Sequence, residues 1–254
     1  MRIDQPIQSE FNHRFMSFFA NSTRLPHIIM LGKPGAGKST LSQILERLHG
    51  YVHISIGAIH RVENAASTEV GLKIRGCIER GEVFGNEMVA ITRALLNKKL
   101  TEIIEEDRRF VLDNFPTAPS YLPYMQELIT KHRLAGRIIL IVPEISNTEV
   151  INRLFFRVVC SNQHCGHTYN LAHAGFAPIN EGKCDYCGFV LSRRLDEYED
   201  ERDQKFRSYQ KKMQTYDQYI FPVIRELSQS QLIECFFIDN ELLRKQFLFR
   251  SFSA

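Results

Sequence analysis

The sequence predicts an α/β fold built on a parallel five-stranded sheet, and its apolar pattern is the main reason. Five short apolar runs have the length of buried strands: residues 27–31, 51–55, 110–113, 137–142 and 235–239. Longer segments between most of them repeat apolar residues with the 3.6-residue period of a helix, as between positions 88 and 104. Strands that alternate with helices form parallel sheets covered on both faces. We therefore expect one sheet between two helical layers.

The composition is that of a globular protein with a substantial core. The 254 residues are 44% hydrophobic and 24% charged, and the formal net charge is +3. So small a positive charge does not indicate a general nucleic-acid binder, and no run reaches the roughly 18 apolar residues of a membrane span. The first residues include Asp4 and Glu10 and lack a long apolar stretch with a cleavage site, which argues against a targeting peptide. We expect a cytoplasmic protein without nucleic-acid or membrane partners.

The first predicted strand leads directly into a phosphate-binding loop, LGKPGAGKST at 31–40. The P-loop motif G-x-x-x-x-G-K-[ST] is matched by Gly32, Gly37, Lys38 and Ser39. Glycines let backbone N–H groups point at phosphate oxygens, and the following helix adds the positive end of its dipole. Lys38 would contact the β- and γ-phosphates, and Ser39 would hold Mg²⁺. The expected cofactors are ATP and Mg²⁺, and the expected cofactor-binding residues of the loop are Gly35, Ala36, Gly37, Lys38, Ser39 and Thr40.

The strand predicted at 110–113 ends in an acid, Asp113. An aspartate after a strand is by itself more often a turn former. In P-loop proteins, however, the acid that orients Mg²⁺ and its waters lies at the end of a neighbouring buried strand. We therefore assign Asp113 to the magnesium site, and the predicted architecture becomes a three-layer P-loop fold.

Residues 158–193 break the α/β pattern and look like an inserted module rich in Cys, His, Gly and Asn. The segments CSNQHCG and CDYCG supply four thiolates that suit tetrahedral Zn²⁺, from Cys160, Cys165, Cys184 and Cys187. Disulfides are the alternative, which a reducing cytoplasm disfavours. Because four residues separate the first pair, His164 can also replace Cys160 or Cys165. Four protein ligands would leave no open position, so this zinc would be structural.

The order of these motifs resembles that of the adenylate kinase family of nucleoside monophosphate kinases, over about residues 27–240. The matching segments are GKPGAGKST, HISIGAIHR, GEVFGNEMV, VINRLFFRVVC, CDYCG, SRRLDEYED, FPVI and FFID. The resemblance implies a monomer that acts on nucleotide substrates. It divides the chain into an N-terminal extension (1–26), a P-loop core (27–155 and 197–254), a helical acceptor-binding flap (55–86) and a zinc-bound lid (156–196).

The resemblance also implies transfer of the ATP γ-phosphoryl group to AMP or a related monophosphate, with both flaps closing to exclude water. Arginines suit this work because guanidinium groups match phosphate oxygens. In motif register, Arg153 lies over the donor adenine, Arg157 on the donor phosphates and Arg61 on the acceptor phosphate. Arg194 clamps the phosphates in flight, and Asp196 and Glu197 close the lid. The implied catalytic residues are Lys38, Asp113, Arg157 and Arg194, and the implied substrate-binding residues are Arg61, Arg194 and Lys205.

The acceptor side departs from the family pattern, in which G-F-P-R follows the strand-ending Asp. Thr117 stands where an arginine would grip the acceptor phosphate, and Tyr121 stands where a glutamine would read adenine. The other departures are Ile56, Ala58, Phe84 and Lys205. The changes at the base-contact positions would shrink the acceptor pocket and remove hydrogen-bond partners. The acceptor is therefore open: AMP, another monophosphate or a small phosphorylated molecule.

A different class of function is an ATP-binding regulatory protein with weak or no transferase activity. Thr117 favours this alternative, whereas Arg157 and Arg194 oppose it, because a switch needs no arginines aimed at a transferring group. A nucleic-acid-binding zinc ribbon is the weakest hypothesis, since the inserted module has few basic residues.

Overall fold

The main sheet has five parallel strands in the order β2-β3-β1-β4-β8. The computed structural model describes residues 25–66, 68–162, 165–172, 176–193 and 202–239. The strands of this sheet are β1 (His27–Met30), β2 (Val52–Ser55), β3 (Phe110–Asp113), β4 (Ile138–Glu144) and β8 (Glu234–Asp239). The five predicted strands and their parallel arrangement are confirmed. Strand β4 runs two residues beyond its predicted end because Pro143 and Glu144 still pair with β8.

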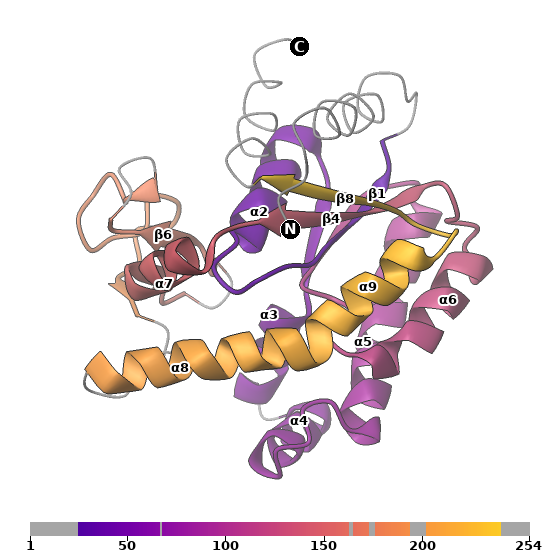
Figure 1. Ribbon diagram of the computed structural model, residues 1–254, viewed down its shortest axis with the longest axis horizontal. Coiled ribbons are helices and arrows are strands. Elements are labelled where there is room, and N and C mark those ends of the chain that lie inside the picture. The colour runs from indigo at the N-terminus through magenta and orange to yellow at the C-terminus, as the bar shows by residue number, and fades with distance from the viewer. Residues whose placement is uncertain (1–24, 67, 163–164, 173–175, 194–201, 240–254) are drawn as a thin grey trace.

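Helices connect these strands and form the rest of the core. They are α2 (Lys38–His49), α3 (Ile56–Ala65), α4 (Glu69–Glu79), α5 (Asn86–Glu105), α6 (Leu122–Lys131), α7 (Asn147–Phe155), α8 (Arg202–Thr215) and α9 (Phe221–Gln229). A π-helical turn, Tyr216–Ile220, joins α8 to α9, and the two helices form one long rod (Figure 1). None of the helices in the described ranges is long and apolar enough to cross a membrane.

Alternate residues of the strands pack into two separate cores, one on each face of the sheet. Ile28 and Met30 of β1 pack with Leu41 and other residues of the α2 side. Ile29, the residue between them, belongs to a larger cluster that includes Leu100 of α5 and residues of α6 and α9. Successive side chains of a strand point to opposite faces, so a strand buried on both faces reads as a continuous apolar run. The predicted three-layer architecture is therefore confirmed.

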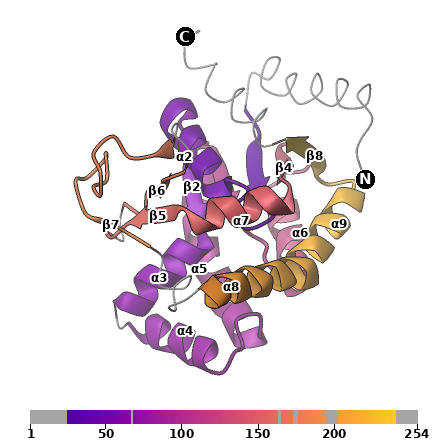
Figure 2. The same ribbon diagram turned by 60° about the vertical axis from the view of Figure 1, so that its left-hand side comes forward.

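Two smaller units extend from the main sheet, as both ribbon views show (Figures 1 and 2). One is an antiparallel sheet of β5 (Arg157–Cys160), β6 (Thr168–Asn170) and β7 (Leu191–Ser192), in the order β6-β5-β7. The other is the pair α3 and α4, which pack so closely that a Cβ at Gly71 would collide with the carbonyl of Glu63. The predicted N-terminal extension, apart from Leu25 and Pro26, lies outside the described residues.

The two-sided core predicts a large penalty for truncating β4. Leu140 is fully buried at the centre of the sheet, so Leu140→Ala should lower the free energy of unfolding by about 2–5 kcal/mol. Leu72→Ala on α4 is the matched control, because Leu72 is 55% exposed and its loss should change stability by about 0.5 kcal/mol or less. Urea denaturation followed by circular dichroism measures both, and equal effects would contradict the assigned core.

Candidate active site

The P-loop lies between β1 and α2, and its lysine folds back over it. Lys38 Nζ donates hydrogen bonds to the carbonyl oxygens of Gly32 (2.9 Å) and Lys33 (2.8 Å). Gly37 caps α2 with φ 79°, a left-handed conformation that favours glycine. A Cβ at Gly35 would lie 3.3 Å from the carbonyl oxygen of Val150, which shows how closely α7 approaches the loop. The geometry is that of a backbone cradle with one ammonium group above it.

A second lysine fixes the loop to the start of α7. Lys33 Nζ donates to Asn147 Oδ1 (2.7 Å) and to the carbonyl oxygen of Ile145 (3.2 Å). These bonds link the phosphate loop to the helix that carries Arg153. Lys33 could not be predicted from the motif, which leaves its position unspecified.

Asp113 lies where the strand register requires an acid. It pairs with Met30 of β1 on one side and with Ser55 of β2 on the other, so its carboxylate stands at the carboxyl edge of the sheet beside the P-loop. It is 3% exposed, and its Oδ2 contacts His53 Nε2 at 3.3 Å. Its Oδ1 is buried and has no hydrogen-bond partner among the described residues. An unpaired buried carboxylate oxygen here fits a ligand role toward hydrated Mg²⁺.

Burial and neighbouring charges shift the pKa values of the ionisable groups in this site. Burial lowers the pKa of Lys38 to about 8, with Asp113 opposing the shift and Arg157 adding to it. Burial alone would raise the pKa of Asp113, but the hydrogen bond and charge of His53 outweigh it, with further help from Ser39 and Lys38, so this pKa is lowered. The structure thus brings both Asp113 and Arg157 within electrostatic reach of Lys38.

Two of the predicted arginines lie around the base of the three-stranded sheet. Arg153 is in the last turn of α7, where its Nε donates to Glu149 Oε1 at 2.7 Å. Arg157 is the first residue of β5 and is partly buried. Arg194, Asp196, Glu197 and the side chain of Lys205 lie outside the described residues, so their assigned roles remain predictions.

The acceptor side contains the substituted residues and a polar cluster that the sequence analysis missed. Asn114 stands at the position of the glycine in the G-F-P-R pattern. Its φ of 58° is a left-handed conformation that Asn tolerates. Tyr121 is buried, and its hydroxyl bonds to Thr92, which also contacts His60. Phe84 packs on Tyr219 with ring centroids 4.2 Å apart. At position 84, where the sequence departs from the family pattern, the side chain thus takes part in aromatic packing.

The four predicted cysteines of the lid converge on one point. Their Sγ atoms all lie within 4.8 Å of one another, and the Cys160–Cys187 and Cys165–Cys184 pairs are 3.3 and 3.7 Å apart. Tetrahedral zinc with bonds of about 2.3 Å holds its sulfurs about 3.8 Å apart, so the cluster is compatible with zinc. All six cysteines are free, so the disulfide alternative is not realised. The second alternative, His164, lies outside the described residues.

Neighbouring groups also favour a thiolate in this cluster. Burial alone would raise the pKa of Cys184, but the Tyr169 hydroxyl and the backbone N–H groups of Tyr186 and Cys187 lower it to about 6. The same module contacts the core, since the Arg47 guanidinium of α2 lies 3.5 Å from the Tyr186 ring centroid. Arg47 Nη2 also lies 3.1 Å from His167 Nδ1. In Figure 2 the strands of the lid lie beside α2.

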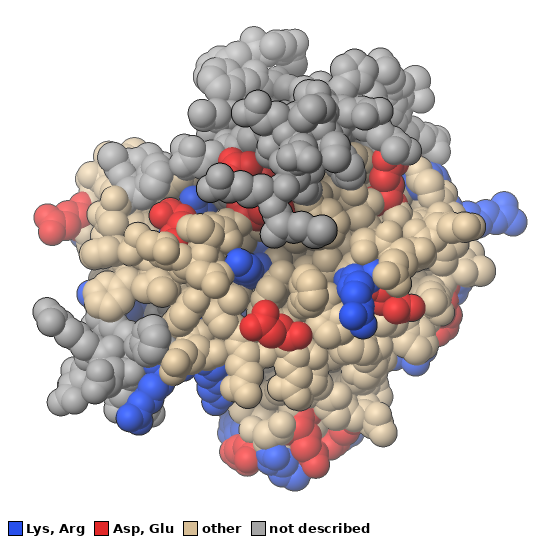
Figure 3. All heavy atoms as spheres, viewed as in Figure 1, with Lys and Arg blue, Asp and Glu red and all other residues tan. Residues whose placement is uncertain are grey.

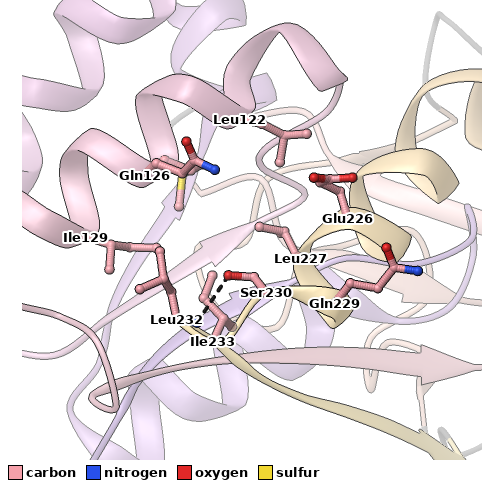
Figure 4. A pocket seen from close by; sticks show the side chains of 10 residues that line it. Leu122, Gln126, Ile129, Glu226, Leu227, Gln229, Ser230, Leu232 and Ile233 are labelled. Carbon is pink, nitrogen blue, oxygen red and sulfur yellow. Dashed lines mark hydrogen bonds between the residues drawn. The ribbon is translucent and has the colours of Figure 1, made fainter.

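A groove of about 160 Å³ between α6 and the segment from α9 to β8 is a weaker candidate site (Figure 4). Leu122, Ile129 and Leu227 give it an apolar lining, and Glu226 is its one carboxylate. It therefore has no set of convergent polar groups comparable to that at the P-loop. On the face seen in Figure 3, Lys and Arg side chains are interspersed with Asp and Glu rather than gathered in one patch.

Comparison with known proteins agrees with the motif order. The family model described as Adenylate kinase matches residues 30–232. The adenylate kinase of Thermosipho melanesiensis is 32% identical over 185 residues, 72% of this chain and 81% of the relative. That of Archaeoglobus fulgidus is 31% identical over 72% of this chain and 80% of its own length. That of Treponema denticola is 30% identical over 81% and 88%, respectively.

The cysteine cluster predicts that the protein binds one zinc ion and that mutation of the cysteines releases it. Cys184→Ser combined with Cys187→Ser should release zinc, because two thiolates cannot complete a tetrahedral site. Cys235→Ser is the matched control, since Cys235 lies in β8, away from the cluster, and the zinc content should stay at one ion per chain. Inductively coupled plasma mass spectrometry of the purified proteins measures this, and unchanged zinc in the double variant would contradict the four-cysteine site.

Proposed function

This chain belongs to the adenylate kinase family of phosphotransferases, and on that premise we propose that it is an ATP-dependent nucleoside monophosphate kinase. The acceptor we propose is AMP or a related monophosphate. The observation that carries the proposal is the set of charges at one edge of the sheet: Lys38 above the P-loop, Asp113 with a buried unpaired oxygen, and Arg157 close enough to shift the pKa of Lys38.

On the donor side, Lys38 would exchange its hydrogen bonds to the loop for hydrogen bonds to ATP phosphates. Lys38 now donates to two loop carbonyls, and phosphate oxygens would compete for the same ammonium group. Burial lowers its pKa to about 8, so the ammonium group is still charged at pH 7, and a nearby anion would stabilise this form in a site where water screens the interaction less. Arg157 would extend the same neutralisation over the donor phosphates, and Arg153 would lie over the adenine.

Magnesium fits the same edge of the sheet. Ser39 and Asp113 would hold it, with Asp113 acting on the coordinated waters through its unpaired oxygen. The ion supplies positive charge that offsets the charge of the transferring group. His53 keeps the Asp113 carboxylate oriented and ionised, since its hydrogen bond lowers the pKa of that acid.

On the acceptor side, we assign Arg61 of α3 to the acceptor phosphate, and Arg194 and Lys205 to the transferring group. Phosphoryl transfer demands alignment and charge neutralisation more than covalent chemistry. Closure of the zinc-held lid and of the α3–α4 flap would exclude water from this space.

An ATP-binding regulatory protein is the second candidate, and Thr117 is the observation that favours it. An arginine that neutralises charge in a phosphoryl-transfer transition state is worth several kcal/mol, and Thr117 cannot replace that charge. The two candidates share ATP binding and differ in turnover.

Substitution of the P-loop lysine tests the proposed chemistry. Lys38→Met should lower ADP formation from Mg·ATP and AMP by about 100-fold or more, because the cation over the phosphates is lost. Lys98→Met is the matched control on exposed α5 surface and should leave the rate unchanged. A coupled assay of ADP formation against a panel of monophosphates is the measurement. Full activity in Lys38→Met would overturn the proposal, and tight ATP binding without turnover in the unmodified protein would favour the regulatory candidate.

Because Thr117 stands where an arginine is expected, an arginine introduced there should raise the activity. Thr117→Arg places a guanidinium after the Asp113 strand and should raise kcat/KM for the monophosphate by about 10-fold or more. Thr117→Gln supplies a long polar side chain without the charge and should give little gain. Steady-state kinetics at varied acceptor concentration measure both, and equal rates in the two variants would show that the charge at position 117 is not limiting.

A further inference from the structure

A closed polar cluster lies on the acceptor side of the site, and the proposed function does not use it. Thr92 of α5 is its centre. Tyr121 Oη lies 3.2 Å from Thr92 Oγ1, and His60 Nε2 lies 3.0 Å from the same oxygen. The three residues come from α3, α5 and the turn before α6, so three separate segments meet at one hydroxyl group.

The hydrogens of this cluster are all assigned by counting donors. The Thr92 hydroxyl has one hydrogen and donates it to the carbonyl oxygen of Met88 at 2.8 Å. It must therefore accept from both other partners, the Tyr121 hydroxyl and the Nε2–H of His60. Burial and the charge of Arg61 lower the pKa of His60, which favours its neutral ring. The single hydrogen of the Tyr121 hydroxyl is thus used inside the protein.

Burial fixes the direction of the Tyr121 side chain. Thr92 is 0% exposed and Tyr121 is 2% exposed, so the hydroxyl group points into the protein. Its ring packs against the ring of Phe115 with centroids 4.9 Å apart. Around the same flap, Ile56 is buried and Phe84 packs on Tyr219. The Tyr121 hydroxyl group is therefore satisfied by protein groups, and its neighbours Ile56 and Phe84 are apolar.

We propose that Thr92 is a specificity-determining residue that holds the Tyr121 hydroxyl away from the acceptor base. This inference rests on the proposed function, in which Tyr121 occupies the position that would read the base. The acceptor class is then nucleoside monophosphates bound through phosphate and apolar contact, with weak discrimination among bases. A site that makes hydrogen bonds to its ligand rejects analogues by about 10⁴-fold, whereas an apolar site discriminates by roughly 10- to 200-fold.

The test is the base selectivity of binding by the full chain. Calorimetry with the β,γ-imido analogue of Mg·ATP present gives Kd values for AMP, GMP, CMP and UMP. The expected Kd values of the unmodified protein lie within about 10-fold of one another. Tyr121→Gln restores an amide and should favour AMP over the other monophosphates by at least about 10-fold. Thr92→Val frees the Tyr121 and His60 donors and should change the ratios of the four Kd values.

Two control variants separate this role from a purely structural one. Thr92→Ser keeps the hydroxyl group and should retain the ratios of the unmodified protein. Thr101→Val changes the same residue type on the same helix, outside the cluster, and should also retain them. Strict selectivity for AMP in the unmodified protein, no measurable binding of any monophosphate, or unchanged ratios in Thr92→Val would overturn the inference.

The same samples distinguish this inference from the proposed function. Similar Kd values for the four monophosphates that change in Thr92→Val, together with no ADP formation, support the role of Thr92 and contradict the kinase proposal. ADP formation with binding restricted to AMP contradicts the role of Thr92 and leaves the kinase proposal standing.

Discussion

The parallel register between β1 and β3 is the constraint on which the rest of the site depends. Met30 pairs with Asp113, so the acid lies beside the point where the P-loop leaves β1. A shift of one residue would turn every side chain of β3 to the opposite face and carry Asp113 away from Lys38. The neighbouring pairs Ile28–Val111 and Ile29–Leu112 are fully buried on opposite faces of the sheet, which makes such a shift costly. Packing of the apolar side chains thereby fixes the position of Asp113 beside the P-loop.

Burial then gives these polar groups their properties. Lys38 and Asp113 each lose hydration at the edge of the sheet, and each partly compensates the other: Asp113 raises the pKa of Lys38, and Lys38 lowers that of Asp113. The balance is incomplete, because Lys38 still has a lowered pKa and Asp113 still has an unpaired oxygen. An anionic donor and a hydrated cation together would satisfy both groups, which supports the proposed binding of ATP with Mg²⁺.

Features encoded within a single segment were predictable from the sequence. The five strands, the P-loop and the two cysteine segments each have a local pattern, and Asp113 follows from the P-loop by one further step. The cluster of His60, Thr92 and Tyr121 has no such pattern, because its members lie about 30 residues apart and only tertiary contacts of α5 with α3 and with the turn Pro119–Tyr121 join them. His53 was equally hidden, although a histidine inside an apolar strand is a signal that could have been weighed.

The contrast between the two halves of the site argues for an altered acceptor rather than a decayed enzyme. Random loss would strike the P-loop and the cysteine cluster as readily as the acceptor groups, yet both retain their geometry. The substituted residues also make specific interactions: the Tyr121 hydroxyl bonds to Thr92, and the Phe84 ring packs on Tyr219. Asn114 has a left-handed backbone conformation. Tyr121 and Phe84 are thus bonded or packed within the protein, and a fully satisfied buried polar cluster makes one arrangement rigid. These interactions support the proposal of an acceptor whose base needs no hydrogen bond from position 121.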